Sequence, residues 1–361
     1  MQKINVGVIG ATGMVGRVFL RMLSEHPWMN VVVVAASERS AGQKMKFKIP
    51  QEEQALIDRE ILEMTIMDAS DVESVSKMVD LIFCAVDMPK DEIIRLEEAY
   101  AKKEVVVVSN NSAMRWHDDV PMIVPEINGV NHLKVLSEQK IRLGTRRGCI
   151  VVKPNCAAQA YMAIMDVIGK QIQIEYVNVS LMQAISGSGK HLSEYPSIHG
   201  NILPLVGEAE KSEKEPMKIF GRFSDGKIIS DTNIPIFATS YRVPVEDGHT
   251  ANVFVKTSNF LIDMYNLKKS FERYNPLADY NLPSSPEVVI DYLGDNVYPE
   301  PLRDVNKHNG MAFVCGELKY NQKFGVLQFT GMVNNIVRGA AGGAVLTAEL
   351  MIKLGYVYPL K

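Results

Sequence analysis

The first third of the chain alternates between short apolar runs and segments whose apolar positions recur at helical spacing. The apolar runs are hydrophobic on both faces, as strands inside a parallel sheet are, and they lie at residues 4–10, 31–36, 81–86 and 105–109. Between them, residues 14–24 and 91–102 show amphipathic helix patterns. This alternation predicts a doubly wound parallel sheet with helices packed on it.

The pattern changes after residue 156. A helical run over about residues 156–171 is followed by longer runs in which apolar and polar positions alternate, at residues 176–185, 251–258, 312–318 and 324–330. A period of two predicts an antiparallel sheet with one covered face. A charge-rich segment at residues 207–218 and a proline-rich one at residues 281–301 are expected to be helix and loop insertions. Residues 334–353 form a strong helix pattern that could return to pack on the first domain.

The length and net charge of the chain limit the classes of function that it can have. The chain has 361 residues, which suits two domains better than a single core. A formal net charge of −3 provides no basic field that would recruit nucleic acid or an anionic membrane. No apolar run approaches the roughly 20 residues that span a bilayer, and the first residues enter a strand pattern without a signal-peptide layout. We therefore expect a cytoplasmic protein with no nucleic-acid or membrane partner.

The four cysteines are scattered and have no paired spacing. This argues against a disulfide framework and against a thiolate metal site, so no metal is expected. Cys84, Cys149 and Cys315 lie in apolar stretches, where a buried and inert thiol is the usual outcome. Cys156 differs because it lies at a polar junction.

A glycine-rich turn follows the first strand and opens the first helix, with the sequence GATGMVG from Gly10. Glycines at such a turn let the backbone approach a pyrophosphate, and the N–H groups of the helix N-terminus attract its charge. The alternative is a tight structural turn. After the second strand stand Ser37, Arg39 and Ser40, which suit the 2′-phosphate of NADP, whereas Glu38 favours the bare ribose of NAD. We predict NADP.

Cys156 is the candidate nucleophile. Pro154 ends the preceding strand, Asn155 can cap a helix, and a strong helix pattern follows. A cysteine at a helix N-terminus would have a lowered pKa, and nearby N–H groups could hold an oxyanion. The alternative is a core cysteine in the first turn of a buried helix.

His249 is the candidate acid or base. Gly248 allows a sharp turn, so His249 would begin a strand at the edge of a domain. Histidine is a natural proton shuttle for a thiol nucleophile, although taken alone this one is more simply a surface or capping residue. Most of the other six histidines are expected to be solvated. Arg242 could grip a carboxylate and Gln183 could orient an acyl group; an exposed arginine and an outward strand position are the alternatives.

Taken in order, ten segments resemble the aspartate-β-semialdehyde dehydrogenase family, particularly its archaeal and fungal branch. They run over nearly the whole chain and read GATGMVG, SERSAG, SNNSAMR, VPEIN, PNC, QAISGSG, NILP, EAEK, RVPVEDGHT and NNIVRGAAGG. The resemblance implies an α/β fold with a Rossmann-type doubly wound parallel sheet and an α+β catalytic and dimerisation domain with a mixed, largely antiparallel sheet. Residues 1–155 and 334–361 would form the NADP-binding domain, and residues 156–333 the other.

The resemblance also assigns roles. It makes Cys156 the acyl-accepting nucleophile, His249 the acid/base and Gln183 a residue that positions the substrate. The implied substrate-binding residues are Arg115 and Asn110 for phosphate, Arg242 for the α-carboxylate, and the pair Glu208 and Lys211. The implied cofactor-binding residues are Gly10, Thr12, Gly13, Met14, Val15, Ser37, Arg39, Ser40, Ser186, Gly187 and Asn335.

The implied activity is NADPH-dependent reduction of aspartyl phosphate to aspartate semialdehyde through a thioester, in a homodimer or homotetramer that serves lysine, threonine, methionine and isoleucine biosynthesis. The sequence departs from the family at Ala157 and Ala158, where Ser or Thr is usual, and at Lys153, which could lower the pKa of Cys156 or face outward.

Three rival interpretations stay open. They are a CoA-acylating reductase such as the malonyl-CoA reductases, which share this ancestry, an N-acetyl-glutamyl-phosphate reductase, and a dinucleotide-sensing or scaffold paralogue that has kept the fold without activity.

Overall fold

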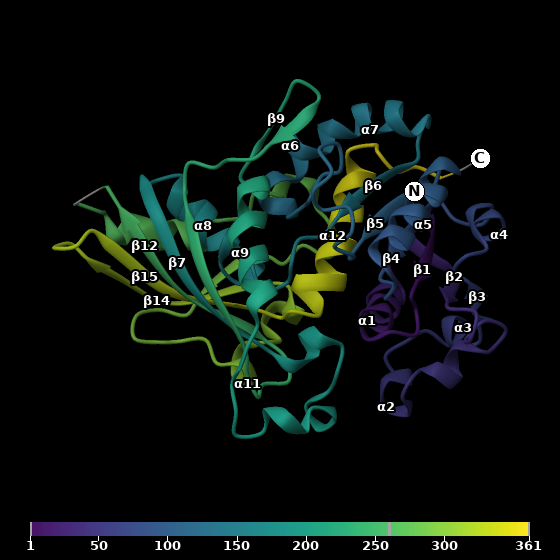
Figure 1. Cartoon of the computed structure of the whole chain (residues 1–361), viewed down its shortest axis with the longest axis horizontal. Coiled ribbons are helices and arrows are strands. Elements are labelled where there is room, and N and C mark those ends of the chain that lie inside the picture. The colour runs from purple at the N-terminus through teal and green to yellow at the C-terminus, as the bar shows by residue number, and fades with distance from the viewer. Residues whose placement is uncertain (1, 259–260, 360–361) are drawn as a thin grey trace.

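The computed structural model describes residues 2–258 and 261–359 and contains two large sheets, one toward each end of the molecule (Figure 1). The first sheet has six parallel strands in the order β3-β2-β1-β4-β5-β6. Their bounds are Ile4–Ile9, Met29–Ala36, Met67–Asp68, Leu81–Cys84, Val106–Ser109 and Cys149–Val152 for β1 to β6. The strand order reverses between β1 and β4, and ligands of such sheets bind at this switch point, beyond the carboxyl ends of the strands.

The four strands predicted from the first third of the chain are all present in this sheet. The helix patterns are confirmed as α1 (Met14–Leu23) and α5 (Lys90–Lys102). Helix α1 buries Phe19, Leu20 and Leu23, and the Phe19 ring stacks on Phe83 of β4 with centroids 4.7 Å apart. The remaining helical segments before β6 are Met45–Lys48, Gln51–Gln54, Arg59–Leu62, Val72–Ser76, Pro125–Gly129, Val130–His132, Leu133–Val135 and Leu136–Leu143.

The second sheet is mixed and has the order β13-β14-β15-β12-β7-β11-β8. Only the β7–β11 and β13–β14 pairs are parallel, so the predicted mixed, largely antiparallel sheet is confirmed. The bounds are Ile174–Gln183 (β7), Leu203–Pro204 (β8), Ile236–Arg242 (β11), His249–Thr257 (β12), Ile290–Tyr292 (β13), Phe313–Asn321 (β14) and Val326–Val333 (β15), with a separate hairpin of Arg222–Ser224 (β9) and Lys227–Ile229 (β10).

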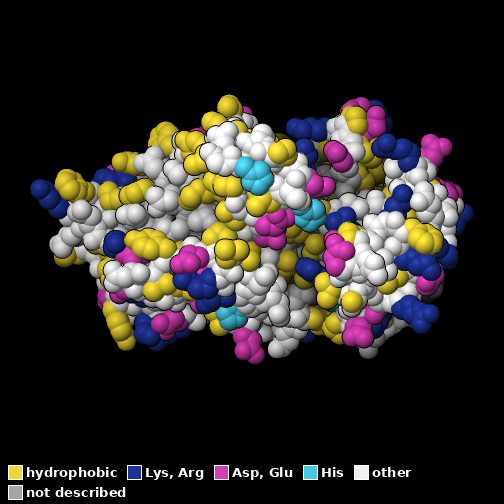
Figure 2. Space-filling model, turned by 90° about the horizontal axis from the view of Figure 1, so that it is seen from below, with side chains coloured by type: hydrophobic (Ala, Val, Ile, Leu, Met, Phe, Trp, Pro, Cys, Tyr) yellow, Lys and Arg dark blue, Asp and Glu magenta, His cyan; other side chains and the backbone are white. Residues whose placement is uncertain are grey.

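One face of the second sheet is covered and the other is open. The covered face lies under α8 (Gln159–Gly169), α9 (Val206–Ile219) and α10 (Met264–Glu272), and it takes the alternate buried residues Val177, Val179 and Leu181 of β7. On the open face, Tyr176, Phe237 and Phe254 are exposed. Hydrophobic side chains are visible among charged ones over this end of the molecule in Figure 2.

The C-terminal segment crosses back to the first sheet. It consists of the π-helix η9 (Val337–Ala341) and α12 (Gly342–Lys353), and it packs against α1, β5 and the π-helical turn at Pro125–Gly129. Helix α12 is apolar on all sides, and ten of its residues plus Glu349 are buried, as expected for a helix that fills a core. In Figure 1 it lies between the two sheets. The domain division at residues 155 and 334 remains a prediction, and residues 360 and 361 of that division lie outside the described part of the chain.

The charged segment and the proline-rich segment differ in how much regular secondary structure they contain. Residues 207–218 belong to the single helix α9, whereas residues 281–301 run largely as a loop with β13 inside it, up to α11 (Pro301–Asp304). Short 3-10 turns complete the chain at Ile185–Ser188, Leu192–Glu194, Pro196–Ile198, Ala278–Tyr280 and Lys307–Gly310. Within the described residues there is no helix of the length and apolarity needed to cross a membrane.

Candidate active site

A cavity of about 610 Å³ opens at the switch point of the first sheet, where the two halves of the molecule meet. Its lining comes from distant parts of the chain: Met14 and Val15 from the glycine-rich turn, Asn110 and Arg115 after β5, Lys153 and Cys156 before α8, Ser186 and Gly187 after β7, and Asn335 and Gly339 before α12. Eight of these ten residues are among those that the sequence nominated.

Cys156 lines this cavity and is in direct contact with His249, which is fully buried. The Cys156 Sγ is 3.2 Å from Nε2 of His249. The backbone N–H of Ala184 donates to Nδ1 of the same ring at 3.0 Å. Because Nδ1 accepts a hydrogen bond, the proton of the neutral imidazole resides on Nε2 and is directed at the sulfur.

Burial dominates the protonation of this pair. Burial, with the neighbouring Arg242, lowers the pKa of His249 to about 3, so the ring is neutral at physiological pH. Burial and then the Glu208 carboxylate raise the pKa of Cys156 to about 11, against the opposing charges of Arg115 and Arg242. The sequence-based prediction of a lowered cysteine pKa was wrong. Helix α8 begins only at Gln159, so Cys156 precedes its first turn and gains little from its dipole.

The ends of three strands of the second sheet place polar side chains near Cys156 and Glu208. Gln183 ends β7, Arg242 ends the adjacent β11 directly opposite it, and His249 begins β12. Gln183 donates to the Ser240 hydroxyl at 2.8 Å and hydrogen-bonds to Glu208. Arg242 donates to the Ala184 carbonyl at 2.6 Å. The backbone of Ala184 therefore holds both the imidazole and the guanidinium.

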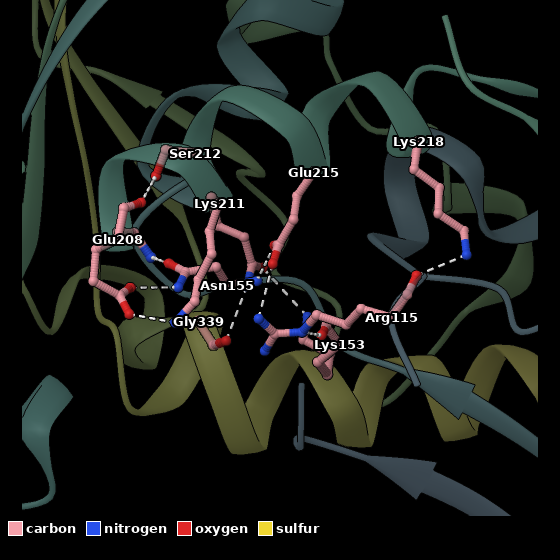
Figure 3. Close-up of polar contacts among 11 residues, drawn as sticks. Arg115, Lys153, Asn155, Glu208, Lys211, Ser212, Glu215, Lys218 and Gly339 are labelled. Carbon is pink, nitrogen blue, oxygen red and sulfur yellow. Dashed lines mark hydrogen bonds and ion pairs between the residues drawn. The ribbon is translucent and has the colours of Figure 1, made fainter. Parts of the chain in front are cut away.

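Helix α9 presents Glu208 and Lys211 to the segment that carries the nucleophile. The Glu208 carboxylate accepts from the Asn155 side-chain amide at 2.7 Å and from the Lys211 ammonium at 2.5 Å (Figure 3). Burial works to raise the pKa of Glu208, but its hydrogen bonds and the charge of Lys211 outweigh burial and lower it. Glu208 is therefore an anion close to the sulfur, and the two predicted substrate residues form an ion pair.

Arg115 and Asn110 reach the cavity from the loop after β5. Arg115 donates through Nε to the Lys153 carbonyl at 2.9 Å and through Nη1 to Glu215 at 2.8 Å. Both polar atoms of the Asn110 side chain are buried and have no hydrogen-bond partner among the described residues. An orphaned amide in a polar cavity is suited to contact a bound molecule.

The glycine-rich turn fits a dinucleotide. Gly10 has a φ of +87°, and a Cβ there would lie 2.2 Å from the Ala85 carbonyl oxygen. A Cβ at Gly16 would lie 2.2 Å from the Gly10 carbonyl oxygen, whereas a Cβ at Gly13 would meet the same oxygen at 3.5 Å, an ordinary van der Waals contact. These are the features of a tight turn, a close helix contact and an unobstructed approach for a pyrophosphate. Thr12 is half-buried on this turn beside Met14 and Val15.

The other predicted cofactor residues fall into two groups. Ser37 and Arg39 are exposed and Ser40 is half-buried on the turn that follows β2. Ser186, Gly187 and Asn335 line the cavity itself. Asn335 accepts the Gly248 N–H at 2.8 Å and donates to the Ser186 hydroxyl at 2.8 Å, so it joins the loops after β7 and before β12.

Two glycines lie against Cys156 and His249. A Cβ at Gly187 would lie 2.8 Å from Nε2 of His249, and a Cβ at Gly339 would lie 2.8 Å from the Cβ of Cys156. Gly339 was not among the predicted residues, although the resemblance included its segment. Both positions need glycine, because any larger side chain would displace His249 at the first position or Cys156 at the second.

Sequence reasoning placed some residues wrongly or missed them. Lys153 is buried, its Nζ lies 3.3 Å from Gln159 Oε1, and burial together with Arg338 lowers its pKa well below the ordinary range. It therefore faces the interior. His26 and His132 are buried rather than solvated. Glu215 was missed altogether, although positions 208, 212, 215 and 219 follow the spacing of one helix face.

Comparison with known proteins identifies the class. The family described as "Semialdehyde dehydrogenase, NAD binding domain" matches residues 5–135, and "Semialdehyde dehydrogenase, dimerisation domain" matches residues 167–338. Fold and matches together define an oxidoreductase of the semialdehyde dehydrogenase class, with an NAD(P)-binding domain and a dimerisation domain.

Individual relatives narrow the class to one family. An aspartate-semialdehyde dehydrogenase of Archaeoglobus fulgidus is 37% identical, over 97% of this chain and 98% of the relative. The crystal structure of aspartate semialdehyde dehydrogenase with NADP from Candida albicans superposes with a TM-score of 0.86 at 26% identity, covering 98% of this chain and 100% of that one. The chain belongs to the aspartate-semialdehyde dehydrogenase family. A malonyl CoA reductase (NADP) of Metallosphaera sedula is 30% identical, over 99% of both chains.

Proposed function

We propose that this protein catalyses the NADPH-dependent reductive dephosphorylation of L-aspartyl-4-phosphate to L-aspartate-4-semialdehyde through a thioester on Cys156. The reaction serves the biosynthesis of lysine, threonine, methionine and isoleucine. The observation that carries the proposal is the 3.2 Å contact between Cys156 and His249 in a cavity reached by Arg115. The charges of Arg115, Arg242 and Glu208 all act on the sulfur, and they suit a phosphate, a carboxylate and an ammonium respectively.

Each of the residues around Cys156 has a separate role in the proposed reaction. The Cys156 thiolate attacks the β-acyl carbon, a thioester forms, and phosphate leaves toward Arg115 and Lys211. Arg242 holds the α-carboxylate and Glu208 the α-ammonium. The turn at Gly10, with Ser37, Arg39 and Ser40, would hold NADPH, which would supply the hydride that reduces the thioester. His249 then hydrogen-bonds through its Nε2–H to the sulfur as the carbon–sulfur bond breaks and the aldehyde is released.

A phosphate-dependence assay tests this function. With L-aspartate semialdehyde as substrate, NADP reduction followed by absorbance should require inorganic phosphate and fall at least roughly 100-fold without it, because phosphate must release the acyl group from Cys156. Coenzyme A should not replace phosphate, and NAD should support a lower rate than NADP. Activity with CoA but not with phosphate would overturn the assignment.

A malonyl-CoA reductase is the second candidate, because the M. sedula enzyme is as similar over the full chain as many aspartate-semialdehyde dehydrogenases are. The ion pair of Glu208 with Lys211 beside Asn155 favours an amino-acid substrate instead. An acyl-CoA has no α-ammonium for Glu208 to bind.

We further propose that the protein acts in the cytoplasm as a homodimer or homotetramer whose contacts use the open face of the second sheet.

Glu208 is expected to control ionisation of the nucleophile. The rate of Cys156 alkylation by iodoacetamide should rise about tenfold per pH unit between pH 7 and 10, because the thiol pKa is raised to about 11 and only the thiolate reacts. Glu208→Gln removes an anion that raises this pKa, so alkylation at pH 8 should be roughly 3- to 10-fold faster. Peptide mass spectrometry measures the rate. Glu210→Gln, on the exposed side of α9, is the matched control, and equal rates in both variants would contradict the prediction.

A further inference from the structure

Helix α9 turns one polar face toward the interior. Glu208, Lys211, Ser212, Glu215 and Lys218 recur at intervals of three or four residues, so they share that face (Figure 3). Ser212, Glu215 and Lys218 are all at most 4% exposed. A charged face buried to this degree must be paired in full, and the pairings show what the helix holds in place.

The Glu215 carboxylate divides its two oxygens between two different elements. Oε1 accepts from Nη1 of Arg115 at 2.8 Å, and Oε2 accepts the backbone N–H of Asn155, the residue before the nucleophile. Arg115 in turn donates from Nε to the carbonyl of Lys153 at 2.9 Å. Glu215 and Arg115 therefore bracket the segment 153–155 from both ends. The remaining Nη2 of Arg115 has no hydrogen-bond partner within the described residues, and Arg115 lines the cavity.

We propose that Glu215 is a positioning residue that fixes the spacing between the Arg115 guanidinium and the Cys156 sulfur. The proposal rests on the proposed function in one respect, that Arg115 receives the phosphate which leaves the acyl carbon. If the arginine and the sulfur are held through one carboxylate, the leaving group and the attacked carbon are placed together. Misplacement by about 1 Å can lower a rate on the order of 100-fold.

Both partners of Glu215 are donors, and this is why a carboxylate is required. Glutamine at this position would offer one acceptor and one N–H group, so a donor would meet either Arg115 or the Asn155 amide. Lys218, one turn further along α9, shows the complementary choice. Its ammonium donates to the carbonyls of Arg115, His117 and Val120 at 2.7, 2.7 and 2.9 Å. Glu215 therefore accepts hydrogen bonds from the donors beside α9, and Lys218 donates hydrogen bonds to the carbonyl acceptors.

The test compares Glu215→Gln with Glu210→Gln, which changes an exposed carboxylate of the same helix that pairs with Lys214. In Glu215→Gln, amide hydrogen exchange in a peptide spanning residues 150–158 should become at least roughly fivefold faster, because glutamine cannot accept from both Arg115 and the Asn155 N–H and so loses its hold at one end of residues 153–155. The kcat of phosphate-dependent NADP reduction should fall about 10- to 100-fold, while the Kd for NADP stays within twofold. Glu210→Gln should match the wild type in all three.

Glu215→Asp keeps both acceptor oxygens and is expected to retain more kcat than Glu215→Gln. Unchanged exchange in residues 150–158, a kcat within twofold of the wild type, or an aspartate variant no better than the glutamine variant would overturn the proposal. Faster exchange spread over the whole molecule would overturn it as well, since it would show a general role in folding. If the wild type shows no phosphate-dependent activity, the proposed function fails, yet the exchange measurement still tests the hold on the segment before Cys156.

Discussion

Cys156→Ala is expected to lose phosphate-dependent NADP reduction by a factor on the order of 10⁴ or more, with NADP affinity unchanged. The thioester cannot form without the sulfur, because the methyl group of alanine is no nucleophile for the carbonyl of an acyl phosphate. The turn at Gly10 and the residues after β2 lie on a different part of the chain, so cofactor binding should persist. Initial rates and a fluorescence titration with NADPH measure the two effects.

Cys149→Ala is the matched control for this loss. Cys149 lies wholly buried in β6, only seven positions before Cys156, and burial raises its pKa to about 12. Its removal should leave the rate within about threefold of the wild type, since it costs packing rather than chemistry. Turnover in Cys156→Ala above about one per cent of the wild-type rate would refute the covalent route.

His249→Asn is expected to lower kcat by about 10²- to 10⁴-fold, and His249→Gln by roughly tenfold less. Asparagine can still accept the Ala184 N–H in place of Nδ1, but it is too short to reach the sulfur. Glutamine is longer and can present an N–H near the position of Nε2, 3.2 Å from Sγ. The order of the two variants therefore tests whether the imidazole serves the reaction as a donor to sulfur.

The pH profile gives an independent check on the same residue. Because the pKa of His249 is lowered to about 3, the ring binds a proton only well below pH 5. Loss of activity between pH 7 and 5 should consequently have the same midpoint in the wild type and in His249→Gln. A midpoint near pH 6.5 that disappears in the glutamine variant would show that the ring titrates as an ordinary histidine does.

Much of the fold could be predicted because both sheets leave a periodic signal. The strands of the first sheet are apolar on both faces, and β7 and β12 alternate between buried and open positions. The strands that were missed are short or carry mixed patterns. β3 has two residues and β8 has two, and the seven residues of β11, IFATSYR, show no regular alternation of apolar and polar positions.

Where residue type and local context coincide, sequence reasoning nominated residues that the structure brings together, as at Cys156 and its neighbour His249. The ionisation of Cys156 could not be predicted, because the burial that raises its pKa is a property of the assembled fold. A capped cysteine before a helix suggests a low pKa, yet the sulfur lies beside Glu208, and the helix starts three residues later. The buried contacts of Glu215 could not be predicted from the sequence for a related reason. A glutamate on a charged helix is usually solvated, and its two donors come from residues 60 and 100 positions away in sequence.

The return of the C-terminal segment has a consequence for synthesis of the protein. Asn335 and Gly339 line the cavity, and α12 fills the core beside β5 and α1. A ribosome translates these residues only after both sheets, so Cys156 and His249 are made well before the segment that closes over them. The cavity beside Cys156 is therefore complete only once this late segment has packed onto the first sheet.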